Sequence, residues 1–380
     1  MTIAQAVAVR MANQGLTARP ATDPRAAALV CAGIQAQDLW ASQLAVRARS
    51  SNITVHDVVE AAAAPTVVRS WLMRGTLHLI AADDLHWMTA VIGPAVLKMA
   101  EPRFVEVGLT PRVRERARTV LPEVLSGCQL TRAELVAALR KRIEDVPGDG
   151  QGPAHLTVWA SASGLICRAG DHGKEPTYAL ADEFIPVRPD PPADPLMELV
   201  RRYVRAFGPV TIEDFAPWSR LPVAPTRRAF AELADELRTV TVAGRVHYVA
   251  ADREPADAEP ADREPAASEP ANHVLRLLPA FDSYLMGYRG RDAFLDPAHR
   301  SDVGAGGILY PTIMVDGVIV GTWRLDRSGR HNNQPITLRA SFFNDAPPWQ
   351  TIALAEEAAD VGRFLARPCD LAIVDSFRTR

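Results

Sequence analysis

Residues 54–80 read TVHDVVEAAAAPTVVRSWLMRGTLHLI, the pattern of a helix followed by a two-stranded hairpin. Thr54 and Asp57 are spaced as a capping box, so we expect a helix from this point to the end of the alanine run. The runs 67–72 and 76–80 are rich in β-branched and aromatic residues and flank Met73-Arg74-Gly75, which predicts a hairpin. Helices followed by such a hairpin describe a winged helix-turn-helix.

The capping box recurs farther along the chain. Thr131 and Thr211 each precede an acidic residue by three positions and open an apolar run, at intervals of 77 and 80 residues. Each box follows a longer amphipathic stretch, and these stretches are 24–34, 111–125 and 195–207. In the first stretch Val30 and Ile34 fall on one helical stripe. Three units of similar build are therefore predicted.

An acidic segment separates the third unit from the rest of the chain. Residues 251–270 repeat the sequence Ala-Asp-Arg-Glu-Pro and contain no large apolar side chain, so we expect them to be disordered. The segment lies between two strand-like runs, 245–249 and 273–278. This position is typical of an insertion at a hairpin tip, where added length costs little.

The C-terminal third departs from the repeat. Segment 279–291 combines aromatic and Arg side chains with glycine, and we interpret it as a contact surface. Residues 309–315 and 318–325 flank Asp316-Gly317, a strong turn signal that predicts a hairpin within a small β-sheet.

Composition narrows the class of protein. A chain of 380 residues with 48% hydrophobic residues is long enough for two or three domains. Neither a membrane-spanning run nor a signal peptide is recognisable, so we expect a cytoplasmic protein. Its four cysteines are scattered and do not cluster with histidine, which favours buried thiols over disulfides or a metal site. The formal charge is −3, but residues 251–270 carry −5, which leaves +2 for the rest.

Two glutamines stand out in the run Gly33-Ile34-Gln35-Ala36-Gln37-Asp38-Leu39-Trp40. Side chains two residues apart face nearly opposite sides of a helix but the same side of an extended segment. Both amides can line one pocket only if the backbone is extended here, which predicts a kink or extended turn after Ile34. On pattern alone, paired glutamines after a helix are usually a solvated helix terminus.

These residues resemble the winged-helix DNA glycosylases that unhook interstrand crosslinks and confer resistance to the alkylating antibiotic azinomycin. The resemblance rests on the Gln-aliphatic-Gln motif and on the segments 73–78, 278–291 and 315–324. A sister branch has Asp at the second motif position, so Gln37 favours the azinomycin-resistance branch. The family is described as three tandem winged helices arranged in a C.

The resemblance implies a monofunctional glycosylase without lyase activity that acts on double-stranded DNA carrying cationic N7-alkylated purines. An N7-alkylated purine leaves as a neutral base, so two amides can serve where glycosidases use carboxylates. We expect Gln37 to orient the attacking water and Gln35 to share that task or contact the sugar, with the roles exchangeable. No metal or organic cofactor is implied, and a monomer is expected. The lesion range, simple N7 adducts or interstrand crosslinks, stays open. The implied DNA contacts are Arg74, His78, Tyr288, Arg289, Arg291, Trp323 and Arg324.

The fold class expected is α+β and mainly helical, with three tandem winged helix-turn-helix units in a C-shaped arrangement plus a small C-terminal β-sheet. The first unit carries the glutamine motif, the third carries the acidic insert 251–270, and the last region carries a hairpin that contacts DNA. The expected bounds are 1–100, 101–190, 191–278 and 279–380.

Other readings compete with this one. A winged-helix DNA-binding protein without chemistry, such as a transcriptional regulator, requires a basic recognition helix, whereas 54–63 is acidic and rich in alanine. A structural adaptor would leave both glutamines free to be replaced. His78 fits a packed strand position as well as a site, Trp71 and Trp323 fit the core, and capping alone explains Asp57.

Overall fold

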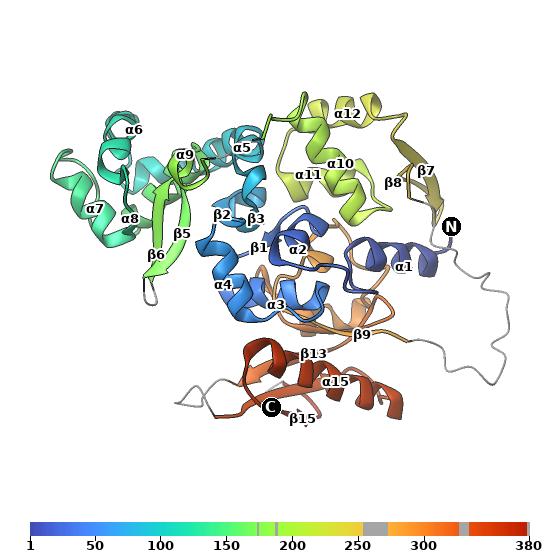
Figure 1. The fold of residues 1–380 in the computed structure, drawn as a ribbon. Helices are drawn as coiled ribbons and strands as arrows, with labels where there is room; N and C mark the ends of the chain where they lie inside the picture. Colours follow the sequence, from blue (N-terminus) through green and yellow to red (C-terminus); the bar gives the residue numbers. More distant parts are fainter. Residues whose placement is uncertain (173–174, 187–188, 254–272, 327–333, 378–380) are drawn as a thin grey trace.

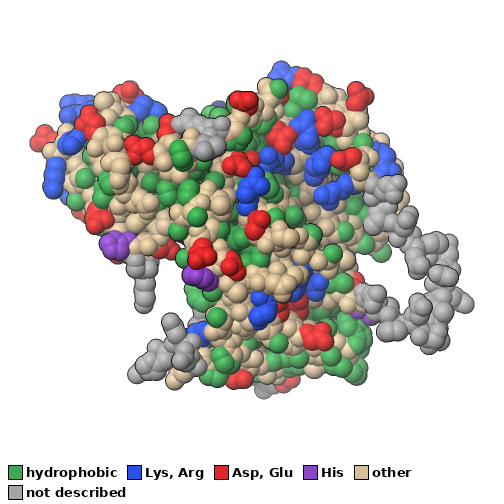
Figure 2. Space-filling model, in the orientation of Figure 1, with side chains coloured by type: hydrophobic (Ala, Val, Ile, Leu, Met, Phe, Trp, Pro, Cys, Tyr) green, Lys and Arg blue, Asp and Glu red, His purple; other side chains and the backbone are tan. Residues whose placement is uncertain are grey.

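The computed structural model of this chain describes residues 1–172, 175–186, 189–253, 273–326 and 334–377. In Figure 1, α1–α4 occupy the middle, α6–α9 with β5 and β6 lie at the upper left, α10–α12 with β7 and β8 at the upper right, and α15 with the C-terminal strands at the bottom. The outline in Figure 2 is indented at the left, between the upper-left lobe and the bottom lobe. Among the described helices, none is long and apolar enough to cross a membrane.

The first region has the predicted order of elements. Thr54 Oγ1 accepts from the Asp57 backbone N–H at 3.4 Å and the Asp57 carboxylate accepts from Thr54 N–H at 2.6 Å, so the capping box forms. The helix then runs to Ala63 and the hairpin follows, as expected. The elements are α1 (Ile3–Asn13), α2 (Pro24–Val30), β1 (Ile34–Gln35), α3 (Leu39–Arg49), α4 (Val55–Ala63), β2 (Val67–Trp71), η1 (Met73–Gly75), β3 (Leu77–Ala81), η2 (Ala82–Asp84) and α5 (Leu85–Glu106).

The helix expected within residues 24–34 is α2, and it ends earlier than the sequence pattern predicts. Ala32 and Gly33 both have a positive φ, 49° and 103°, which the right-handed helix does not allow. A Cβ at Gly33 would also lie 3.1 Å from the side chains of Ile80 and Met73. The assignment of Val30 and Ile34 to one helical stripe is therefore wrong, because α2 stops at Val30 and Ile34 lies in a strand.

The second and third regions repeat the helix and hairpin pattern, and both further capping boxes form. The second contains α6 (Pro111–Leu125), β4 (Leu130–Thr131), α7 (Arg132–Arg140), α8 (Gly152–Ala162), β5 (Ile166–His172), β6 (Glu175–Leu180) and α9 (Ala181–Phe184). The third contains α10 (Pro195–Phe207), α11 (Ile212–Ser219), α12 (Val223–Glu232), β7 (Leu237–Val242) and β8 (Arg245–Ala250).

One sheet joins the first two regions. Its strand order is β1-β3-β2-β5-β6-β4, so the hairpins of the two regions lie side by side. The β2–β5 contact is made at the pair Arg69 and Arg168. This shared sheet links the strand that carries Gln35 to the second region through the two intervening strands β3 and β2.

The predicted hairpin around the acidic segment is wrong. Strand β8 pairs with β7, across a turn at Ala243-Gly244 whose φ values are 48° and 75°. Residues 275–278 form β9, which pairs with β12 in another sheet. Two positive φ values in a two-residue turn match the right-handed twist of a hairpin, so β7 is the local partner of β8. Most of the acidic segment, 254–272, lies outside the described residues.

The C-terminal region is a five-stranded sheet of order β15-β14-β13-β12-β9, with α15 packed against β9 and β15. The Asp316-Gly317 turn forms as predicted, with φ of 49° and 84°. The first strand of this hairpin is β12, which starts at Thr312 and not at residue 309 as expected, because Leu309 belongs to the short β11. The elements are β9 (Leu275–Leu278), α13 (Ser283–Met286), η3 (Pro297–His299), α14 (Arg300–Val303), β10 (Gly304–Ala305), β11 (Ile308–Leu309), β12 (Thr312–Val315), β13 (Val318–Asp326), β14 (Ile336–Phe342), α15 (Pro348–Leu365) and β15 (Cys369–Ile373).

The interpretation of 279–291 as a contact surface is wrong for its aromatic side chains. Tyr284 and Tyr288 are buried in the main core beside Phe294. The expectation of buried thiols holds for Cys31 and Cys167 but not for Cys128, which is exposed.

Candidate active site

The two glutamines lie in a non-helical segment between two helices, as their spacing predicts, with Gln35 in strand β1 and Gln37 in the bend that follows. Gln35 in β1 pairs with His78 in β3, and Ala36 N–H donates to Leu77 O at 2.7 Å. Asp38 then caps α3 by accepting from Ala41 N–H at 3.1 Å. The glutamine segment is therefore held by strand pairing before Gln37 and by a helix start after it.

Arg74 fixes the orientation of the Gln35 amide. Its Nη2 donates to Gln35 Oε1 at 2.8 Å. A guanidinium only donates hydrogen bonds, so the amide oxygen faces Arg74 and the amino group faces away. Arg74 reaches this position from the tight turn between β2 and β3, where its φ is +59°. Only 8% of Gln35 is exposed.

His78 lies beside the same guanidinium and is neutral. Burial, and next to it the charge of Arg74, lower the pKa of His78 to about 3. Nδ1 lies 3.0 Å from Thr76 O, so this nitrogen carries the hydrogen and Nε2 is the acceptor. Nε2 lies 3.5 Å from Arg74 Nη2, a long contact. The two hydrogens of Nη2 are thus directed at Gln35 and His78.

Gln37 is exposed and is held through its carbonyl group. Gln37 Oε1 accepts from Leu77 N–H at 3.3 Å. Within the described part of the chain, neither Gln35 Nε2 nor Gln37 Nε2 donates a hydrogen bond to another residue. The site therefore presents two free amide donors, while each oxygen keeps a second lone pair for a water or a substrate hydrogen.

Two polar residues of the site, Ser70 and Arg220, are not indicated by any pattern in the sequence. Ser70 lies opposite His78 on β2, so Gln35, His78 and Ser70 share one face of the sheet. The Ser70 hydroxyl is buried and has no hydrogen-bond partner among the described residues. Arg220 ends α11, which packs against η1. Burial and the charge of Arg220 lower the pKa of Arg74 to about 10.

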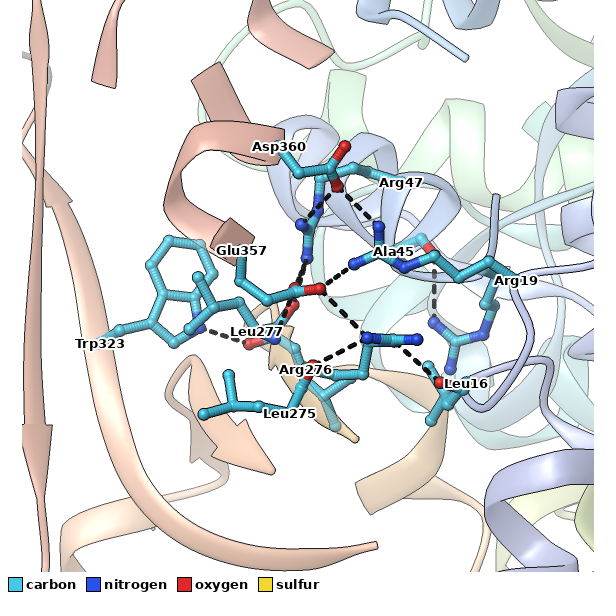
Figure 3. Close-up of polar contacts among 12 residues, drawn as sticks. Leu16, Arg19, Ala45, Arg47, Leu275, Arg276, Leu277, Trp323, Glu357 and Asp360 are labelled. Atoms are coloured by element: carbon cyan, nitrogen blue, oxygen red, sulfur yellow. Dashed lines mark hydrogen bonds and ion pairs between the residues drawn. The ribbon is translucent and has the colours of Figure 1, made fainter. Parts of the chain in front are cut away.

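A buried ion network anchors the helix that follows Gln37 (Figure 3). Arg47 of α3 is 1% exposed and donates to Glu357 at 3.0 Å, to Asp360 at 2.9 Å and to Leu277 O at 2.8 Å. Glu357 also accepts from Leu277 N–H at 3.1 Å. Arg19 and Arg276 complete the network. It ties the last turn of α3 to α15 and β9, and so anchors the helix that begins beside Gln37.

Two of the expected DNA contacts are wrong. Tyr288 is 7% exposed, donates its hydroxyl to Phe207 O at 2.9 Å and lies under the guanidinium of Arg10. Trp323 is 2% exposed and donates Nε1 to Leu278 O at 2.8 Å. Both side chains form part of the core, because a buried ring with a satisfied polar atom is a stable packing unit.

The other expected contacts differ in exposure. Arg289 and Arg324 are exposed, and Arg324 lies over the ring of Phe377. Arg291 is half-buried and donates to Leu285 O at 2.8 Å. Arg74 and His78 lie at the glutamine site itself. Among the described residues, no group of three or more His, Cys, Asp or Glu side chains is placed to hold a metal ion.

Comparisons with known proteins cover almost the whole chain. A family model described as "DNA glycosylase AlkZ-like" matches residues 29–364. An "Interstrand DNA cross-link repair glycosylase" of Streptomyces sahachiroi is 30% identical, over 94% of this chain and 95% of the relative. The solved structure of Streptomyces sahachiroi DNA glycosylase AlkZ is similar at a TM-score of 0.79 and 26% identity, covering 98% of this chain and 100% of that one.

Proposed function

Because the chain belongs to the family of AlkZ-like DNA glycosylases, we propose that it is a monofunctional enzyme that hydrolyses the N-glycosidic bond of cationic N7-alkylated purines. The observation that carries this proposal is the pair of glutamine side chains in non-helical backbone, each held through its carbonyl oxygen and each with an amino group that has no partner among the described residues. Such a pair is neutral and fixed in orientation.

A neutral pair of amides suits a cationic substrate. Glycosidases use one carboxylic acid to protonate the leaving group and one carboxylate as base or nucleophile. An alkylated purine already carries positive charge and leaves as a neutral base, so the first of these groups is not required. Two tasks remain. Oriented dipoles can position water, which is a weak nucleophile, and they can stabilise the oxocarbenium-like sugar. Ordinary purines lack the charge and remain poor substrates.

We assign the attacking water to Gln37 and the sugar of the damaged nucleoside to Gln35. Gln37 is exposed and its carbonyl oxygen keeps a lone pair for a water hydrogen. Gln35 is almost buried and is held by Arg74, so it supports a group that enters the site rather than mobile solvent. One preorganised group of this kind contributes about 3 kcal/mol to lowering the barrier.

The proposed substrates are alkylated duplexes, and we extend them to interstrand crosslinks. The printed name of the relative from Streptomyces sahachiroi refers to crosslink repair. The exposure of Gln37 also favours this extension, because a crosslinked base is tethered to the opposite strand and cannot turn into an enclosed pocket. Three winged helices arranged in a C, with the bounds expected from the sequence, would hold the duplex through phosphate contacts. We propose that one copy of the chain suffices and that it acts in the cytoplasm.

The test is base release from a duplex with one N7-methylguanine, alongside an unmodified duplex and one with a nitrogen-mustard crosslink. We expect free base and an abasic site from the methylated duplex, none from the unmodified one, and separation of the crosslinked strands. Binding of all three duplexes without release of any base would contradict the proposal and favour a non-enzymatic DNA-binding protein.

The absence of lyase activity is tested in the same reaction with borohydride. A lyase forms a covalent imine through an amine, and borohydride traps it. The candidate amine for such an imine is Lys98, which is exposed on α5, a helix packed against η1. We expect no trapped protein–DNA adduct. An adduct that disappears in Lys98→Ala would contradict monofunctional hydrolysis.

A further inference from the structure

Arg74 is a half-buried cation that has no counter-ion among the described residues. Its Nη1 is buried and has no hydrogen-bond partner among the described residues, and its Nη2 contacts two neutral groups, Gln35 and His78. In the described part of the chain it forms no ion pair with a carboxylate. Buried charges are ordinarily paired, because an uncompensated charge in the interior is costly.

A second unpaired arginine lies next to it. Arg220 is exposed and ends α11 in the left-handed conformation, with φ of 63°. The packing of α11 on η1 brings the two guanidinium groups close enough to repel one another. Arg220, too, has no ion pair among the residues that the structure describes. The two charges come from segments 146 positions apart in the sequence and meet beside Gln35.

From this juxtaposition, we propose that Arg74 and Arg220 form a phosphate site that binds a phosphodiester adjoining the damaged nucleoside. This inference rests on the proposed function, since it assumes that the damaged nucleoside lies at Gln35 and Gln37. Arg220, whose side chain is exposed, makes the direct contact. Arg74 adds its charge from beneath while it holds the Gln35 amide.

A phosphodiester fits this place better than a base carbonyl does. A carbonyl oxygen is neutral and would leave the two charges uncompensated, whereas a phosphate supplies the missing anion. Every nucleoside within a DNA strand has a phosphodiester on both sides, so a lesion at the glutamines brings one with it. The planar guanidinium of Arg220 also matches two phosphate oxygens at once.

Phosphate binding here would order the reacting groups. The anion offsets the repulsion between the two guanidinium groups and so strengthens the position of Arg74. Because Arg74 holds Gln35 at 2.8 Å, a phosphate seated on this pair sets the register of the damaged sugar against the catalytic amide. The site thus couples DNA binding to the orientation of Gln35.

The experiment is a double-substitution cycle read by equilibrium binding. The protein is titrated with duplexes containing a tetrahydrofuran abasic analogue, in which a neutral methylphosphonate replaces either the 5′ or the 3′ adjoining phosphodiester. Wild-type protein is compared with Arg220→Gln and with the matched control Arg227→Gln, which removes another exposed arginine, on α12. This readout does not depend on base release, so failure of the glycosylase proposal is scored separately, on an N7-methylguanine duplex.

We expect the methylphosphonate at one of the two positions to weaken wild-type binding about tenfold, as loss of a charge-assisted contact does. Arg220→Gln should weaken binding of the native duplex by a similar factor and lose no further affinity on that methylphosphonate duplex. Arg227→Gln should keep the full methylphosphonate effect. Wild-type affinity that is unchanged at both positions, or losses that multiply in Arg220→Gln, would overturn the phosphate site.

Discussion

At the scale of single residues, Arg74 orients the Gln35 amide, which we propose to be catalytic, through a rigid planar group that an ammonium does not reproduce. The planar guanidinium fork fixes the direction of the Nη2 hydrogen that is donated to Gln35 Oε1, whereas the ammonium group of a lysine rotates freely. Arg74→Lys keeps the charge and loses this fork, so the rate of base release should fall at least about tenfold. Single-turnover rates at saturating protein measure the effect, with duplex affinity as the control. An unchanged rate would show that Gln35 needs no such support.

His78 gives a pH dependence of stability whose sign follows from its lowered pKa. The folded value is about 3 and the ordinary value 6.5, so the unfolded chain binds the extra proton between these limits. The contribution of His78 is complete above pH 6.5 and is lost as the pH falls toward 3. His78→Gln should flatten the slope of the free energy of unfolding by at most about 1.4 kcal/mol per pH unit. Urea unfolding at pH 7, 6 and 5 tests this, and parallel profiles for both proteins would contradict it.

At the scale of elements, the position of α3 depends on buried ion pairs. Arg47 is 1% exposed and bonds to Glu357, Asp360 and a strand carbonyl. Arg47→Met leaves these acceptors short of a donor, so the free energy of unfolding should fall by about 3 kcal/mol. The matched control is Arg228→Met on α12, whose pair with Glu232 is exposed and should cost less than about 0.5 kcal/mol. Equal losses from the two substitutions in chemical denaturation would contradict the anchoring role.

Local signals in the sequence predict those elements whose cause is itself local. The three Thr capping boxes, the Asp316-Gly317 turn and the non-helical backbone at the glutamines all depend on residues a few positions apart, and the sequence predicts all of them. The Ala243-Gly244 turn is not predicted, because the strand-like runs on the two sides of the acidic segment favour the wrong partner for β8. The early end of α2 is also not predicted, although Gly33, with φ of 103°, is the residue type that commonly follows a helix.

The candidate site is less predictable than the elements that carry it. Gln35 and Gln37 are recognisable through their spacing and through the family resemblance, which the comparisons confirm. Arg220 comes to the site through the packing of α11 on η1 and Ser70 through the β2–β3 hairpin, and no residue pattern marks either of them as a site residue. The burial of Tyr288 and Trp323 likewise depends on distant partners, Phe207 and Leu278, which a single sequence does not pair.

At the scale of the whole molecule, the exposed arginines should contribute to DNA binding through charge alone. Arg324 is exposed at the C-terminal sheet, and Arg324→Gln should weaken binding equally for damaged and undamaged duplexes. The magnitude of the slope of log affinity against log salt concentration should decrease by the amount that corresponds to about one phosphate contact. Tyr288→Phe is the contrasting variant and should keep the wild-type salt slope, since the Tyr288 hydroxyl is buried and donates to Phe207 O. An Arg324→Gln protein with the wild-type salt slope would exclude this side chain from the interface.

The measurement that addresses the central claim most directly is single-turnover release of N7-methylguanine by wild-type protein, Gln37→Ala and Gln35→Ala, each first shown to be folded and to bind duplex DNA. The two amides are predicted to be the catalytic groups, so Gln37→Ala should slow release about a hundredfold, in line with the loss of one preorganised group. Gln35→Ala should slow it as well. Rates for both variants within threefold of wild type would contradict the account, because the paired glutamines would then serve the structure of this segment and not the reaction.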